Sequence, residues 1–215
     1  MPTTLPSPAP LKAGVSFKSM RIVEIGGGWT PFFMRYYIKL SPHTHYSLIE
    51  RDEAGLRRSR EKITHSPEYN FLIRQNQVCF HLLPNSSHLD RSISEYGYDE
   101  AVLSNVLSAP LYQKIPASPA DEDEQKHLEV NKKILDHALA LVKPGGSVRV
   151  YTDIKIYGPQ AWQSLLKSPD YSWTLDEQET KRLTALNTWK LQTGTYEAGF
   201  KEEALTEPVV YTIIK

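Results

Sequence analysis

The sequence predicts an α/β fold: a single doubly wound, mostly parallel sheet of seven strands that ends in an antiparallel pair. Three observations lead to this prediction. Short apolar runs alternate with segments of helical spacing, as in strands joined by right-handed crossover helices. The first run ends in three consecutive glycines, Gly26 to Gly28, where a buried strand enters a turn. The last two apolar runs flank Glu207-Pro208 and are near enough in sequence to pair.

Five apolar runs predict the parallel strands, at residues 20–25, 46–49, 77–83, 99–106 and 147–153. Thr30 is expected to cap a first helix over 31–40, with Pro31 at its first position. A charged helix is expected over 52–64 and ends near Ser66-Pro67.

The second half predicts three more helices. Acidic residues at 121–124 and Lys143 suit the two ends of a helix dipole, and apolar side chains recur between them at helical spacing. Pro144-Gly145-Gly146 is expected to end that helix in a turn. A short helix is expected at 162–166, and a longer one follows at 177–191. Its inward residues are expected to be Leu183, Leu186 and Trp189. The terminal strand pair is expected at 200–205 and 209–214.

Composition bounds the partners and the compartment. The 215 residues suit one domain over 19–215 behind a flexible, Pro- and Ser-containing tail at 1–18. The tail lacks the features of a signal peptide, and no run approaches the roughly 18 apolar residues of a membrane helix. We therefore expect a soluble, cytoplasmic protein. The 25 basic residues balance the 25 acidic ones, so no net charge attracts nucleic acid or membranes. Cys79 is the only cysteine and is expected to be a buried small hydrophobe.

The glycine turn and an acid after the second strand both fall at the carboxyl edge of the sheet, where such folds bind ligands. Gly26 and Gly28 fit the start of a dinucleotide motif, G-x-G-x-x-G, but its third position is Pro31. Glu24 lies two residues before the turn. A carboxylate there repels phosphate and attracts an ammonium group. The turn therefore predicts a nucleoside with a cationic or zwitterionic tail as its ligand.

This stretch resembles the first motif of the class I Rossmann-like methyltransferases, which use S-adenosylmethionine. The family motif is an acid followed by x-G-x-G-x-G, and Thr30 stands here in place of the third glycine. The resemblance implies that the loop passes beneath the methionine part of the cofactor. Trp29 is expected to lie against the cofactor or to pack under the first helix. The cofactor residues implied in this motif are Glu24, Gly26, Gly27, Gly28, Trp29 and Thr30.

Two further family features follow the second and third strands. An acid that accepts hydrogen bonds from both ribose hydroxyls is represented by Glu50, with Asp52 as the alternative and Arg51 in the same site. Glu50 is otherwise a solvated acid at the start of a charged helix. A polar residue near the adenine is represented by Asn85 or Ser86.

The fourth motif of the family resembles "YDEAVLSNVLSAP" at 98–110, where Ser104 and Asn105 end the strand beside the expected methyl group. Asn105 is otherwise a cap for the next segment. The turn at 144–146 and the terminal strand pair resemble the family as well. Together, these features cover about residues 20–215.

The other polar clusters do not predict a specific site. His43-Thr44-His45 is too sparse for a zinc site, and no metal is expected. His81 and His88 are weak candidates for a base. The basic run Arg57-Arg58-Ser59-Arg60 with Lys62 indicates a solvated helix face rather than a nucleic-acid surface.

The resemblance implies transfer of a methyl group to an O or N nucleophile, for which the protein mainly aligns the reactants; no catalytic residue is identified. A small-molecule acceptor is favoured, a protein side chain comes second, and nucleic acid is disfavoured. Acceptor choice is expected in the tail, at 108–122 and at 154–195, where Tyr and Trp suit an aromatic acceptor or core packing equally.

The alternatives are a non-catalytic member that binds the nucleoside or a partner, and an aminopropyltransferase-like enzyme. This chain lacks the pair of aspartates that the aminopropyltransferase family places after the fourth strand. A nicotinamide oxidoreductase is disfavoured by Glu24 and Pro31. The oligomeric state is not indicated.

Overall fold

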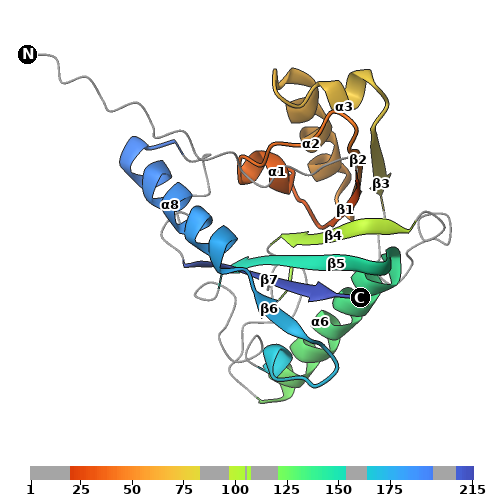
Figure 1. Cartoon of the computed structure of the whole chain (residues 1–215), viewed down its shortest axis with the longest axis vertical. Helices are drawn as coiled ribbons and strands as arrows, with labels where there is room; N and C mark the ends of the chain where they lie inside the picture. Colours follow the sequence, from red (N-terminus) through yellow and green to blue (C-terminus); the bar gives the residue numbers. More distant parts are fainter. Residues whose placement is uncertain (1–19, 83–96, 105, 108–120, 154–163, 196–206) are drawn as a thin grey trace, which may run out of the picture.

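Seven strands form one mixed sheet in the order β3-β2-β1-β4-β5-β7-β6 (Figure 1). The computed structural model describes residues 20–82, 97–104, 106–107, 121–153, 164–195 and 207–215. The strands are β1 (Arg21–Ile25), β2 (His45–Glu50), β3 (Val78–Leu82), β4 (Tyr98–Ser104), β5 (Val142–Asp153), β6 (Trp173–Leu175) and β7 (Pro208–Ile214). The helices are α1 (Phe32–Arg35), α2 (Glu53–His65), α3 (Phe71–Arg74), α6 (Asp121–Leu141) and α8 (Glu177–Thr193).

The first five strands are parallel, and β7 is antiparallel to both β5 and β6. The predicted fold class, with its antiparallel pair near the C-terminus, is therefore confirmed. Among the described residues the antiparallel partners of β7 are β5 and β6, and the expected partner at 200–205 lies outside these residues. The expected tail at 1–18 lies outside them too.

The position of β1 between β2 and β4 determines where a ligand can lie. The chain leaves β1 toward β2 on one side and later returns to β4 on the other, so the crossover connections diverge at this point. Such a switch in a parallel sheet leaves a crevice outside the carboxyl ends of the strands. The glycine turn follows β1, Glu50 ends β2, and Ser104 ends β4.

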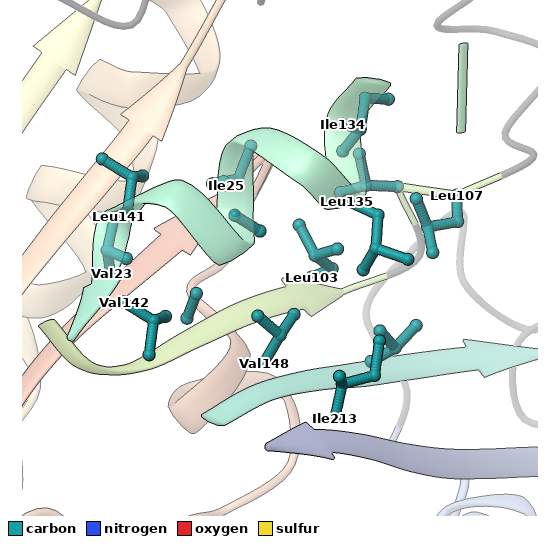
Figure 2. Close-up of a cluster of buried hydrophobic side chains, with 14 of the residues drawn as sticks. Val23, Ile25, Leu103, Leu107, Ile134, Leu135, Leu141, Val142, Val148 and Ile213 are labelled. Atoms are coloured by element: carbon teal, nitrogen blue, oxygen red, sulfur yellow. The ribbon is translucent and has the colours of Figure 1, made fainter. Parts of the chain in front are cut away.

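Two helical layers bury the two faces of the sheet (Figure 1). Helix α6 packs on one face, where its Ile134 and Leu135 meet β4 and β5 residues such as Leu103 and Val148 (Figure 2). Helices α1, α2, α3 and α8 cover the other face. Alternation along β4 supplies both layers, because Leu103 faces α6 whereas Val102 packs on the opposite side.

Helix α1 is much shorter than expected. It covers only Phe32–Arg35, and Pro31 is its N-cap instead of its first residue. Tyr37 then adopts a left-handed φ of 53°, which ends the helix. Phe32 and Phe33 are buried, so tertiary packing rather than length stabilises this single turn.

The expected turn at Pro144-Gly145-Gly146 is also corrected. Helix α6 ends at Leu141, and these residues lie within β5, where the register against β4 shifts. Gly145 has a φ of 78°, and its N–H donates to the carbonyl oxygen of Lys215 at 3.0 Å. The segment is therefore an irregularity of the strand, stabilised by the C-terminus.

Cys79 is exposed, contrary to the expectation of burial. It lies in β3, the edge strand of the sheet. Its neighbours Val78 and Phe80 pack against the core beneath α2 and α3, and alternation along the strand turns Cys79 to the opposite face.

The long helices agree with the sequence. Helix α2 is capped by Asp52 and starts one residue later than expected. Helix α8 buries Leu183 and Leu186 as predicted, while Trp189 packs partly buried against the same core. Residues 164–166 are helical within the predicted helix at 162–166. No helix among the described residues is long and apolar enough to cross a bilayer.

Candidate functional site

The turn after β1 has a backbone that only glycine suits. Gly26 and Gly28 have φ values of 73° and 59°, in the left-handed region that side chains disfavour. The Gly26 N–H donates to the carbonyl oxygen of Ile49 at 2.8 Å, which ties the turn to β2. A Cβ on Gly26 would lie 2.6 Å from Val106 Cγ2. The turn is thus closely packed between β2 and the segment after β4.

Glu24 lies directly beneath this turn. A Cβ on Gly27 would lie 2.6 Å from Glu24 Oε1, and Glu24 itself is 0% exposed. Its two oxygens accept the Phe32 N–H, each at 3.1 Å, and Oε2 also accepts the Tyr46 hydroxyl. Glu24 therefore satisfies the first amide of α1, the role that the sequence predicted for Thr30.

Burial raises the pKa of Glu24 from 4.5 to about 8, against the opposing effects of the Phe32 N–H and the Arg35 charge. Glu50 adds a smaller upward effect on this pKa. The group therefore keeps its proton near neutral pH. A neutral carboxyl attracts an ammonium less than a carboxylate does. The predicted attraction of Glu24 for a ligand ammonium stays a prediction, and the contacts show that Glu24 supports the turn.

Glu50 joins the loops that follow β1 and β2. It is 3% exposed. Its Oε2 accepts the Gly28 N–H at 2.7 Å, and its Oε1 accepts the N–H groups of Arg51 at 2.7 Å and Asp52 at 3.2 Å. A carboxylate accepts about four hydrogen bonds, so these three leave room for about one more. Asp52 is exposed, and its carboxylate caps α2 through Ala54 and Gly55.

Trp29 and Thr30 contact side chains of α2. Trp29 is 47% exposed, and the Arg58 guanidinium lies 3.7 Å from the centroid of its ring. Of the two expected positions for Trp29, packing under the first helix is therefore not what the structure shows. Thr30 is buried, and its hydroxyl accepts a hydrogen bond from the Lys62 ammonium. The three arginines of the basic run are exposed, as expected for a solvated helix face, whereas Ser59 is buried and Lys62 is half-buried.

Ser104 ends β4 and is buried under α1. Its hydroxyl accepts a hydrogen bond from Arg35 Nη1 at 3.5 Å and donates to the Tyr36 hydroxyl at 3.5 Å. Of the predicted site residues, the structure brings together the glycine turn, Glu24 and Glu50. Three others lie outside the described residues, namely Asn85, Ser86 and Asn105.

Tyr46 and an ion pair were missed by the sequence analysis. Tyr46 lies within an apolar strand, and only its hydroxyl indicated a polar role. Glu100 is buried and Arg149 is mostly buried, with Glu100 Oε2 3.6 Å from Arg149 Nη2. Burial raises the pKa of Glu100 to about 7, against the lowering effect of Arg149. The signal for this pair was an acid within the apolar run of β4.

The two histidine candidates for a base stay predictions. His81 is half-buried on β3, and desolvation lowers its pKa. His88 lies outside the described residues. Within the described ranges, no three His, Cys, Asp or Glu side chains are grouped so as to hold a metal ion.

The chain resembles methyltransferases of known structure. No family model matches the sequence, and no curated protein matches it. TrmN from Thermus thermophilus matches with a TM-score of 0.51 and 16% identity, over 94% of this chain and 46% of TrmN. A predicted O-methyltransferase from Agrobacterium tumefaciens matches with a TM-score of 0.50 and 13% identity, over 95% of this chain and 78% of that protein. The carbon methyltransferase CurJ has a TM-score of 0.49 and 17% identity, over 91% of this chain and 48% of CurJ.

The chain thus spans less than half the length of the TrmN and CurJ structures. At these identities the likeness concerns the fold alone. The chain has the Rossmann-like fold of the class I methyltransferases.

We predict that Gly26→Ala destabilises the protein more than Gly145→Ala. Both glycines have similar left-handed φ values, 73° and 78°, but a new Cβ meets Val106 at 2.6 Å only at Gly26, whereas it meets nothing within 4 Å at Gly145. Left-handed strain costs about 1–2 kcal/mol in either variant, and overpacking adds about 1–3 kcal/mol in Gly26→Ala. Urea unfolding of both variants measures the difference, and equal losses would contradict the packing of the turn.

We also predict that Glu24 makes stability fall as pH rises. The folded protein holds the Glu24 proton up to about pH 8, whereas the unfolded chain releases it near pH 4.5. Between these values the folded state binds more protons, so stability is lost as pH rises through this window. Glu24→Gln releases no proton and should lose less stability than wild type between about pH 6 and about pH 8.

Urea unfolding at the two pH values tests this prediction. The comparison between variant and wild type removes the contribution of Glu100, which has the same sign, because both proteins contain it. Parallel pH profiles for the two proteins would show that Glu24 is ionised in the folded state.

Proposed function

We propose that the chain is an S-adenosylmethionine-dependent methyltransferase that acts on an O or N nucleophile, on a small molecule first and a protein side chain second. One observation carries the proposal: the buried Glu50 at the end of β2 accepts the N–H of Gly28 at 2.7 Å. This contact joins a glycine turn and an acid at the carboxyl edge of a sheet with the class I methyltransferase fold.

The contacts of this edge favour a nucleoside ligand. The glycines expose backbone without side chains, and the remaining acceptor position of Glu50 suits one ribose hydroxyl. Asp52 is exposed beside it and is available for the second hydroxyl. We propose the cofactor contacts at Glu24 (through the turn that it supports), Gly26, Gly27, Gly28, Trp29, Thr30, Glu50, Arg51, Ser104 and, outside the described residues, Asn85, Ser86 and Asn105.

The bound cofactor supplies an activated methyl group. Held along the glycine turn and at Glu50, it would donate this methyl group to a lone pair of the acceptor, and S-adenosylhomocysteine would be released with the electron pair of the broken carbon–sulfur bond. The acceptor proton passes to solvent or to a base. The task of the chain is to align the nucleophile and exclude water. Glu24 and Glu50 hold the turn on which the cofactor is proposed to lie.

We propose that the segment at 154–195 contributes to acceptor choice, although two of its aromatic residues pack in the core. The Tyr171 hydroxyl donates to Asp136 of α6 at 2.7 Å, and Trp173 Nε1 donates to the carbonyl oxygen of Leu165 at 3.3 Å. Both side chains pack against the core around α6. Core packing therefore explains these two aromatic residues. We also propose one domain over 19–215, because strands from 21 to 214 share one sheet.

Calorimetric titration with S-adenosylmethionine, S-adenosylhomocysteine and NAD tests the proposed function. The two adenosyl ligands should bind and NAD should not. Glu50→Gln should weaken both adenosyl ligands by about ten- to a hundredfold, since it removes a charged hydrogen-bond acceptor. Glu53→Gln, which changes an exposed acid on α2, is the matched control and should bind as wild type does.

Failure of both adenosyl ligands to bind would refute the proposal. Binding of NAD alone would favour an oxidoreductase instead. Binding of the adenosyl ligands without methyl transfer to any acceptor would indicate the non-catalytic alternative.

A further inference from the structure

Helix α2 contacts the glycine turn at the carbonyl oxygen of Gly28, whereas Glu50 contacts the N–H of the same residue. We propose that Ser59 and Gly55 are positioning residues, which set the shape of the turn that carries the methionine part of the cofactor. This inference rests on the proposed function and assigns to the interior of α2 a role in cofactor affinity.

Ser59 reaches out of its own helix. It is 0% exposed, and its hydroxyl donates to the carbonyl oxygen of Gly28 at 3.0 Å. A hydroxyl inside a helix commonly bonds back to a carbonyl one turn earlier. Thr64 of the same helix does this with Arg60 at 2.8 Å. The contact of Ser59 is therefore a tertiary one, made to a residue 31 positions away.

Both backbone polar groups of Gly28 are held by buried side chains. Its N–H donates to Glu50 Oε2 at 2.7 Å, and its C=O accepts from Ser59. These two contacts orient the two peptide planes that flank Gly28. Gly28 has a φ of 59°, and a glycine backbone adopts positive and negative φ about equally readily, so contacts must select its conformation. The two side chains together select one backbone conformation of the turn.

Gly55 allows α2 to approach closely enough for this contact. A Cβ at Gly55 would lie 3.2 Å from the Gly28 carbonyl oxygen and 3.1 Å from Trp29 Cδ1. Glycine is a poor helix former. Its presence inside α2 therefore costs helix stability but lets the helix approach the turn closely. Arg58 on Trp29 and Lys62 on Thr30 extend the same contact along one helix face.

The position of the contact between Ser59 and Gly28 determines which ligands a change in it would affect. The turn is proposed to lie beneath the methionine part, whereas Glu50 lies beside the ribose. Loss of the hydrogen bond to the Gly28 carbonyl oxygen should lower the affinity for ligands that contain the methionine part. It should leave 5′-methylthioadenosine, which lacks the amino acid carbons, almost unaffected.

Calorimetric titration of Ser59→Ala with S-adenosylhomocysteine and with 5′-methylthioadenosine tests the inference. S-adenosylhomocysteine should bind about two- to tenfold more weakly than to wild type, as expected for one lost hydrogen bond. The affinity for 5′-methylthioadenosine should change by less than about twofold. Thr64→Ala, which removes a hydroxyl bonded within α2, is the matched control and should change neither affinity.

Gly55→Ala is the second variant, in case Ser59→Ala does not fold. It places a methyl group against the Gly28 carbonyl and should show the same selective loss. The inference alone is overturned if wild type binds S-adenosylhomocysteine but the variants lose no affinity, or lose affinity equally for both ligands. Absence of adenosyl-ligand binding in wild type overturns the proposed function, and the inference with it.

Discussion

Two buried carboxyl groups hold the backbone between β1 and α1, and the candidate site depends on them. A sharp turn at the end of a buried strand leaves amides without partners in the sheet or in the helix, and an unsatisfied buried amide is costly. Glu24 accepts the Phe32 N–H from beneath, and Glu50 accepts the Gly28 N–H from the side. Through these contacts the turn is shaped by side chains already positioned in β1 and β2.

The short helix after the turn is held at both ends. Its first amide contacts Glu24, while two basic side chains of α8 reach its last carbonyls. Arg182 donates to Tyr36 O at 2.9 Å, and Lys190 donates to Arg35 O at 3.0 Å. A single helical turn is not stable by itself. The C-terminal helix α8, far away in sequence, therefore contributes to the geometry of the site at the other end of the chain.

Local patterns predicted every described strand except β6, and they predicted the glycine turn and Glu50 at one edge of the sheet, because apolar runs, glycines and an acid at a strand end are local signals. The contacts of Glu50 with Gly28 depend on two strands that meet only in the fold, and nothing local marks them. The same reason explains the missed Tyr46. It also explains why Thr30 was predicted to satisfy the first amide of α1, a contact that Glu24 makes instead. The excess length predicted for α1 has a different reason, because the helix ends before Tyr37, which adopts a left-handed φ. The exposure of Cys79 follows from its edge strand, a property of topology rather than of local sequence.

We propose that the two buried acids shape the turn before an adenosyl ligand binds to it. A crystal structure of the protein with S-adenosylhomocysteine tests it most directly. We expect the ligand to lie along residues 26–28 with its ribose at Glu50, and the contacts of Glu24 with Phe32 and of Glu50 with Gly28 to be retained. A ligand bound away from this turn, or a turn rebuilt with those two contacts broken, would contradict it.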